Sequence, residues 1–94
     1  MAIAILQEFP DMNPEQASAI LEALDLAGKS PSGQLFHVDG PMADGGVRVV
    51  DVWESQEAFD SFLRDTLMPA FGRAGVQVGP PTTTVWPVSH LLQP

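Results

Sequence analysis

Three residues near the middle of the chain have side chains that could do chemistry together. His37 lies in one predicted strand, and Asp51 and Trp53 lie in the next. Alternate residues of a strand share a face, so these three, with Leu35 and Asp39, fall on one face of a hairpin. A carboxylate beside an imidazole sets its tautomer and raises its basicity. His37 held by Asp51 would therefore act as a general base on an acidic C–H group or a phenol.

The contact between these two residues depends on how the strands pair, which the sequence leaves open. One pairing sets Asp39 opposite Val47. His37 then opposes Val49, and Asp51 lies on its diagonal, about 7–8 Å away between Cβ atoms. Side chains or one water can bridge that distance. The alternative to catalysis is a structural hydrogen bond between His37 and Asp51.

Apolar and aromatic residues would bind the rest of a substrate. We expect Leu35 and Val49 to form pocket walls and Trp53 to stack on an aromatic ring, unless Trp53 belongs to the core or a dimer interface. Trp86, in the last predicted strand, would line the pocket or pack against a second copy of the chain. His90, beyond that strand, would join the site or dock on the partner.

Other chemistries lack the residues they need. The chain has no cysteine and only two histidines, so we expect no metal site. A nucleophile elbow and a glycine-rich phosphate loop are also missing. Neither predicted helix contains a histidine, which argues against haem. We therefore expect a protein that works without a cofactor.

The charge of the chain narrows its partners. Twelve acidic residues against four basic ones give a net charge of −8. Nucleic acids and anionic membranes require clustered lysine and arginine, so neither is an expected partner. The N-terminal residues lack the basic start of a signal peptide, and no apolar run approaches the roughly 20 residues that span a bilayer. The expected location is the cytoplasm.

Six predicted elements position these residues in one domain, residues 1–94. Their order, β-α-β-β-α-β, predicts a ferredoxin-like α+β fold with a four-stranded antiparallel sheet. Proline in the last strand favours an edge position for it. The predicted strands are 2–9, 34–39, 47–54 and 82–88, and the predicted helices are 14–26 and the stretch from Ser55 to Gly75.

Local signals mark the ends of both helices. Asn13 is an expected N-cap, with Pro14 at the first helical position and Gln16 completing a capping box. Gly28 is expected to end this helix. In the second helix, whose N-cap is Ser55, Pro69 removes a backbone donor and should bend the chain.

Residue parity divides the hairpin into an apolar face and a mixed face. We expect the apolar face to pack against the two helices and the mixed face, with His37, Asp51 and Trp53, to meet a second copy of the chain. A domain of 94 residues has a thin core, which also favours a dimer. The apolar face consists of Phe36, Val38, Val50 and Val52.

Several segments together resemble small uncharacterised proteins of the dimeric α/β-barrel superfamily, which includes antibiotic-biosynthesis-monooxygenase-like domains. The resemblance implies that two ferredoxin-like protomers join their sheets into a barrel, with a pocket in each. It rests on residues 46–55, 57–59 and 67–71, with support from residues 1–9, 36–38 and 86–88.

The residues and the resemblance together favour a cofactor-free enzyme, monooxygenase- or cyclase-like, acting on an aromatic or polyketide-like substrate. Its partners would be a second copy of the chain and a hydrophobic or aromatic small molecule. The alternative is a dimeric protein without catalysis, which binds a ligand or belongs to a stress response.

Overall fold

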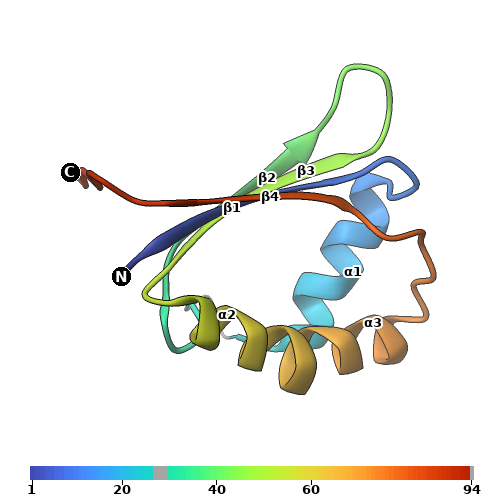
Figure 1. The fold of residues 1–94 in the computed structure, drawn as a ribbon. Helices are drawn as coiled ribbons and strands as arrows, with labels where there is room; N and C mark the ends of the chain where they lie inside the picture. The colour runs from blue at the N-terminus through green and yellow to red at the C-terminus, as the bar shows by residue number, and fades with distance from the viewer. Residues whose placement is uncertain (27–29, 94) are drawn as a thin grey trace.

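The structure is a computed structural model that describes residues 1–26 and 30–93. A four-stranded antiparallel sheet carries all its helices on one face (Figure 1). This arrangement confirms the predicted ferredoxin-like fold. The strands lie in the order β2-β3-β1-β4, so the proline-containing last strand is at an edge, as predicted. Their bounds are β1 (Ile3–Phe9), β2 (Gln34–Pro41), β3 (Val47–Trp53) and β4 (Thr82–Pro87).

Helix α1 (Pro14–Leu24) begins with the predicted capping box. The Asn13 side chain accepts a hydrogen bond from the Gln16 amide at 2.8 Å, and the Gln16 side chain accepts one from the Asn13 amide at 3.0 Å. The helix ends at Asp25, which adopts a left-handed conformation with φ of 53°. Gly28, the predicted stop, lies outside the described residues.

The second helical stretch runs without a gap through α2 (Gln56–Phe62), the π-helical turn η1 (Leu63–Leu67) and α3 (Met68–Ala74). Ser55 caps it by accepting a hydrogen bond from the Ala58 amide. The amide of Met68 donates to the carbonyl of Leu63, five residues earlier. The wide turn immediately before Pro69 fits a helix that must continue past a residue without an amide hydrogen. The predicted disturbance at Pro69 therefore takes the form of a π turn.

The two hairpin faces are the reverse of the prediction. Trp53 is completely buried and packs against Phe59 and Phe62, with ring centroids 5.8 and 5.0 Å apart. Phe36 and Val38, expected to face the helices, are 42% and 48% exposed on the opposite side of the sheet. Parity grouped the residues correctly, but both groups are rich in apolar side chains. The indole buries much more apolar area than a valine, and this favours its face as the inner one.

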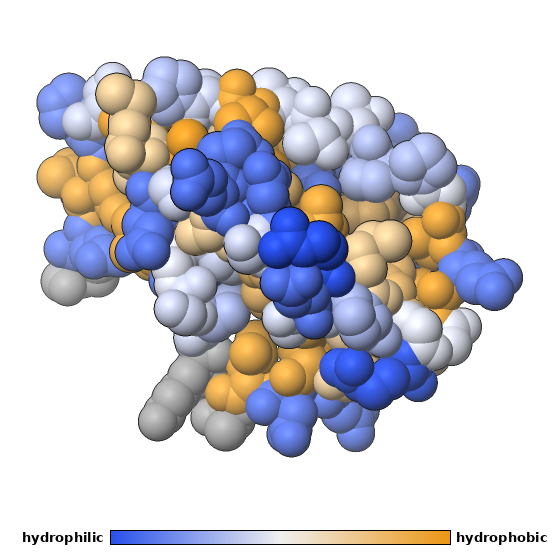
Figure 2. Space-filling view, turned by 60° about the horizontal axis from the view of Figure 1, so that its bottom comes forward, coloured by the Kyte–Doolittle hydropathy of each residue, from blue (hydrophilic) through white to orange (hydrophobic). Residues whose placement is uncertain are grey.

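The core forms two apolar clusters between the sheet and the helices, and the helix side of the surface mixes hydrophilic with hydrophobic residues (Figure 2). Among the described residues, no helix is long and apolar enough to cross a membrane. One cluster contains Phe9, Met12, Ile20, Val47 and Val76, and the other contains Ile5, Trp53 and Phe59.

Replacing Asn13 with alanine should destabilise the protein. The substitution removes the side-chain acceptor for the Gln16 amide, and loss of such a cap costs about 1 kcal/mol. Chemical denaturation would measure the change in the free energy of unfolding. Ser18→Ala, at an exposed position of the same helix, should change it by less than about 0.5 kcal/mol. Equal effects of the two substitutions would contradict a stabilising cap.

Candidate functional site

The pairing of β2 with β3 sets His37 directly opposite Asp51. The expected pairing of Asp39 with Val47 is wrong by two residues, because Asp39 faces Val49 and Pro41 faces Val47. Strand β2 continues to Pro41, and residues 42–46 make the turn. The direct pairing shortens the distance that His37 and Asp51 must bridge.

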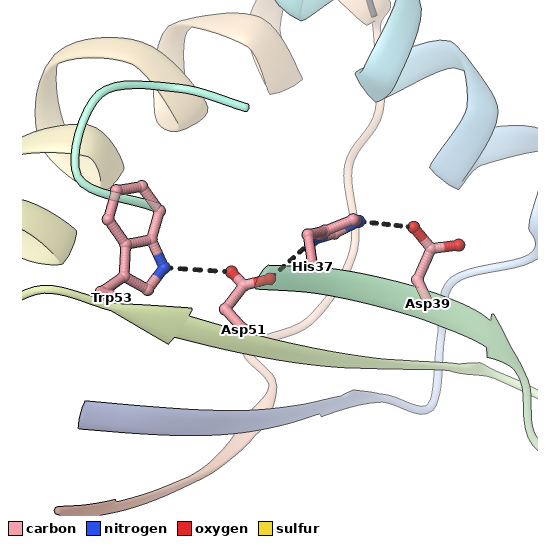
Figure 3. Close-up of polar contacts among 4 residues, drawn as sticks. All are labelled: His37, Asp39, Asp51 and Trp53. Atoms are coloured by element: carbon pink, nitrogen blue, oxygen red, sulfur yellow. Dashed lines mark hydrogen bonds and ion pairs between the residues drawn. The ribbon is translucent and has the colours of Figure 1, made fainter. Parts of the chain in front are cut away.

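Four side chains on the inner face form a continuous row of hydrogen bonds (Figure 3). His37 Nδ1 lies 2.6 Å from Asp51 Oδ1, and Trp53 Nε1 donates to the other oxygen, Asp51 Oδ2, at 3.3 Å. At the far end, His37 Nε2 lies 2.8 Å from Asp39 Oδ2. The predicted contact between His37 and Asp51 is present. Each oxygen of the buried Asp51 carboxylate has its own partner, as a buried charge requires.

The two carboxylates determine the protonation state of His37. The hydrogen bond to Asp51 is the main cause that raises its pKa from 6.5 to about 9, partial burial opposes the rise, and the hydrogen bond to Asp39 adds to it. At neutral pH His37 is therefore an imidazolium, and both ring N–H groups donate to carboxylates. In this state the ring has no lone pair with which to accept a proton.

A cavity of about 100 Å³ lies between this row and the helices. His37 and Asp39 line it from β2, and Asp51 and Val49 line it from β3, where Val49 lies between Asp39 and strand β1. Gln7 of β1 lines the same cavity. The helices and neighbouring segments contribute an apolar wall: Met12, Ala17, Ile20, Leu21, Leu24, Leu26, Pro31, Phe62, Leu67 and Phe71.

Two residues that were expected to bind a ligand on this face, Trp53 and Leu35, do not line the cavity. Trp53 does not line the cavity, because its ring is buried against α2 and its N–H is bonded to Asp51. Leu35 is displaced by an irregularity in the pairing of β2 between Gln34 and Phe36. Gln34 lines the cavity in its place. Val49 is the predicted wall residue that the structure brings to the site.

Trp86 and His90 lie on the other side of the sheet. They line a separate hollow on the outer face, together with Phe36, Val50 and Val52. The segment that carries His90 crosses this face, and Gln93 Nε2 donates to the carbonyl of Leu35 at 3.2 Å. The structure therefore does not bring Trp86 or His90 together with His37. Figure 1 shows this segment following β4, on the side away from the helices.

Three polar residues of the cavity are absent from the predicted site, namely Asp39, Gln7 and Gln34. Asp39 shares the predicted face of His37 but has no predicted role, and Gln7 belongs to a strand that the sequence marks as apolar. A signal for Gln7 exists in the sequence, because it stands between Ile5 and Phe9, two residues of the same parity that pack inward. A glutamine at such a position is an amide in the core. Among the described residues, no cluster of histidine, aspartate and glutamate is arranged to hold a metal ion.

Solved structures share this fold. A protein from Chloroflexus aurantiacus, predicted to be an antibiotic biosynthesis monooxygenase, superposes with a TM-score of 0.71 at 14% identity, covering 99% of this chain and 98% of its own. SnoaB of Streptomyces nogalater, a cofactor-independent oxygenase, gives 0.68 at 16% identity, covering 97% and 96%. The chain has the fold of these oxygenase-like proteins. This matches the resemblance seen in the sequence.

A third solved structure with this fold is of a protein that is described as a dimer. A dimeric ferredoxin-like protein of unknown function from Thermobifida fusca gives a TM-score of 0.67 at 12% identity, covering 94% of this chain and 92% of its own. No protein-family model matches the sequence. The search of curated proteins also finds no match. At these identities the comparisons establish the fold, and the site must be argued from its own geometry.

The stability of the protein should fall as the pH rises through about 9. The pKa of His37 is higher in the folded protein, about 9, than its ordinary 6.5. Its stabilising contribution is therefore complete below pH 6.5 and is lost as the pH passes 9. Denaturation between pH 6 and 10 would measure this loss. In His37→Gln the free energy of unfolding should no longer fall as the pH passes 9. An imidazole that titrates near 6.5 by NMR would contradict the assignment.

Proposed function

We propose that the cavity binds a small aromatic or enolic molecule and that the chain removes an acidic proton from it without a cofactor. The observation that carries the proposal is the Asp39–His37–Asp51 group on the cavity wall. Two carboxylates and one imidazolium give this group a net negative charge beside an apolar chamber. SnoaB, which is described as a cofactor-independent oxygenase, supports the reaction class.

Within this group the proton acceptor is Asp39. Asp51 is buried and both of its oxygens are occupied, and His37 is already protonated at neutral pH. The Asp39 side chain is 28% exposed and uses only Oδ2 in its bond to His37. A substrate hydroxyl at Asp39 would lose its proton to the carboxylate, and His37 Nε2–H would then donate to the new oxyanion. Asp51 and Trp53 keep the ring oriented for this role.

The resulting anion can react in the two ways that the proposed enzyme classes require. In an oxygenation, the carbanion form reduces O2, and a CH2 group becomes a carbonyl while the second oxygen atom leaves as water. In a cyclisation, the same carbanion attacks a carbonyl of its own molecule, and the alkoxide formed takes up the proton held on Asp39. Neither route needs an electron carrier bound to the protein. The non-catalytic alternative is favoured by one observation, the saturation of both His37 nitrogens by carboxylates.

Asp39→Asn should abolish most of the activity while preserving the fold. The amide keeps the shape of the side chain but is a far weaker base, and loss of a general base costs about 10²- to 10⁴-fold in kcat. Oxygen uptake and C–H proton exchange with hydroquinone and 4-hydroxyacetophenone would measure it. As a matched control, Asp44→Asn in the hairpin turn should leave kcat unchanged. If the unsubstituted protein acts on none of these compounds, the non-catalytic alternative replaces the enzyme.

We also infer that two copies of the chain associate through the outer sheet face. This face has no helix over it (Figure 1), and Phe36, Val38 and Trp86 are each more than 40% exposed there. Exposed apolar groups on a sheet are typical of an interface. The dimeric ferredoxin-like protein of Thermobifida fusca supports this assembly. The expected result is a homodimer whose two cavities lie on the outer sides of the joined sheets.

Val38→Glu should convert this dimer to monomers. The substitution places a carboxylate at a position that is 48% exposed on the outer face, where it would be buried against the partner. Light scattering after size-exclusion chromatography would report the mass, and circular dichroism would show that the monomer is folded. Met68→Glu adds the same charge on the helix side and should leave the dimer intact. A monomeric parent protein, or a dimer that survives Val38→Glu, contradicts this interface.

A further inference from the structure

Gln7 is a buried amide that the rest of the fold does not use. It is only 8% exposed, it lies in the central strand β1, and its inward neighbours Ile5 and Phe9 are core residues. Among the described residues its side chain makes no hydrogen bond, yet it lines the cavity. A glutamine amide offers two donors and an acceptor. Among the described residues no polar side-chain atom is fully buried without a partner, so the Gln7 amide keeps some exposure in the cavity, where a ligand could reach it. Gln34, the other glutamine of the cavity, is only partly buried and can meet water.

The sheet sets Gln7 and Asp39 at opposite ends of an apolar floor. Both residues pair with Val49, one from β1 and the other from β2. Adjacent strands are about 4.8 Å apart, so the two backbones are separated by roughly 10 Å across Val49. All three residues line the same cavity. The two side chains therefore flank the same apolar floor, and a small ligand lying over Val49 could reach a polar group at each end.

The size and charge of the site limit which ligands could bind. The volume of about 100 Å³ is of the same order as the roughly 150 Å³ of a cavity known to hold benzene, so the expected ligand is about one ring in size. The three ionised groups at one end, Asp39, His37 and Asp51, have a net charge of −1. A carboxylate or phosphate ligand would be repelled there, whereas a neutral hydroxyl would be accepted.

We propose that Gln7 is a second polar anchor, which binds a carbonyl or hydroxyl oxygen at the far end of a neutral ligand no larger than one ring. The near end of that ligand is an acidic hydroxyl at Asp39 and His37. This inference rests on the proposed function for the identity of the reacting end. The amide itself is a binding group and takes no part in proton transfer.

A pair of probes separates the amide from the rest of the site. 4-Hydroxyacetophenone has a carbonyl opposite its hydroxyl, and 4-ethylphenol has a similar shape without that oxygen. NMR titration at pH 6.5 should show that the protein prefers the ketone, and Gln7→Met should reduce this preference about tenfold, the worth of one hydrogen bond in a cavity. Gln34→Met, the matched control, should leave the preference unchanged.

The same variants give a second readout that does not depend on any ligand. Gln7→Met replaces an amide that opens into the cavity with an apolar side chain of similar length. Its thermal midpoint should therefore not fall, because no internal hydrogen bond is lost. Gln34→Met should change it little, because Gln34 is only partly buried. A fall in the midpoint of Gln7→Met would show that the amide has a structural partner, and would overturn the proposal.

The remaining outcomes also decide the question. A preference for the ketone that survives Gln7→Met, binding of 4-hydroxybenzoate in place of the neutral probes, or no binding of either probe would overturn the second anchor. Selective binding without oxygen uptake or proton exchange would support the anchor and refute the enzyme. Turnover by the unsubstituted protein, together with an unchanged preference in Gln7→Met, would support the enzyme and refute the anchor.

Discussion

Burial of the Asp51 carboxylate between the sheet and the helices is the constraint on which the rest of the site depends. An ionised carboxylate can enter a core only if its oxygens are paired. His37 supplies one partner and Trp53 the other, at 2.6 and 3.3 Å. The bond to His37 requires His37 and Asp51 to face each other across β2 and β3, and the bond from Trp53 is made within β3. The pairing of the hairpin, the inward position of Trp53 and the imidazolium state of His37 all agree with this arrangement.

Much of the fold could be predicted because its signals are local. The capping box at Asn13, the cap at Ser55 and the order of the elements follow from short segments of sequence. The inner face of the hairpin could not be predicted this way, since Phe36 and Val38 are as apolar as Val49. The choice depends on Trp53 packing against a helix that follows it in the chain.

The site was only partly predictable, for two physical reasons. Parity places His37 and Asp51 on the same face. Whether they are directly opposite or diagonal depends on where β2 ends and the turn begins. Gln7 belongs to a different strand, and its place across Val49 from Asp39 results from the sheet order, which sets β1 beside β3. The prediction that Trp86 lines the pocket or packs against a second copy rests on its residue type alone. Its exposure on the outer face follows from its pairing with Ala4, whose neighbour across the sheet is Val52.

The two faces of the sheet have different proposed roles. The inner face forms the cavity that would bind a ligand, and the outer face would form the dimer interface. Alternate residues of β3 point in opposite directions, so Val49 and Asp51 belong to the cavity while Val50 and Val52 belong to the outer face. The helices of the same protomer close the cavity, and a partner is not needed to form it. A dimer through the outer face would stabilise a small domain without covering its site. Burial of the Asp51 carboxylate is costly in a thin core, and a dimer interface would supply further buried apolar area that offsets this cost.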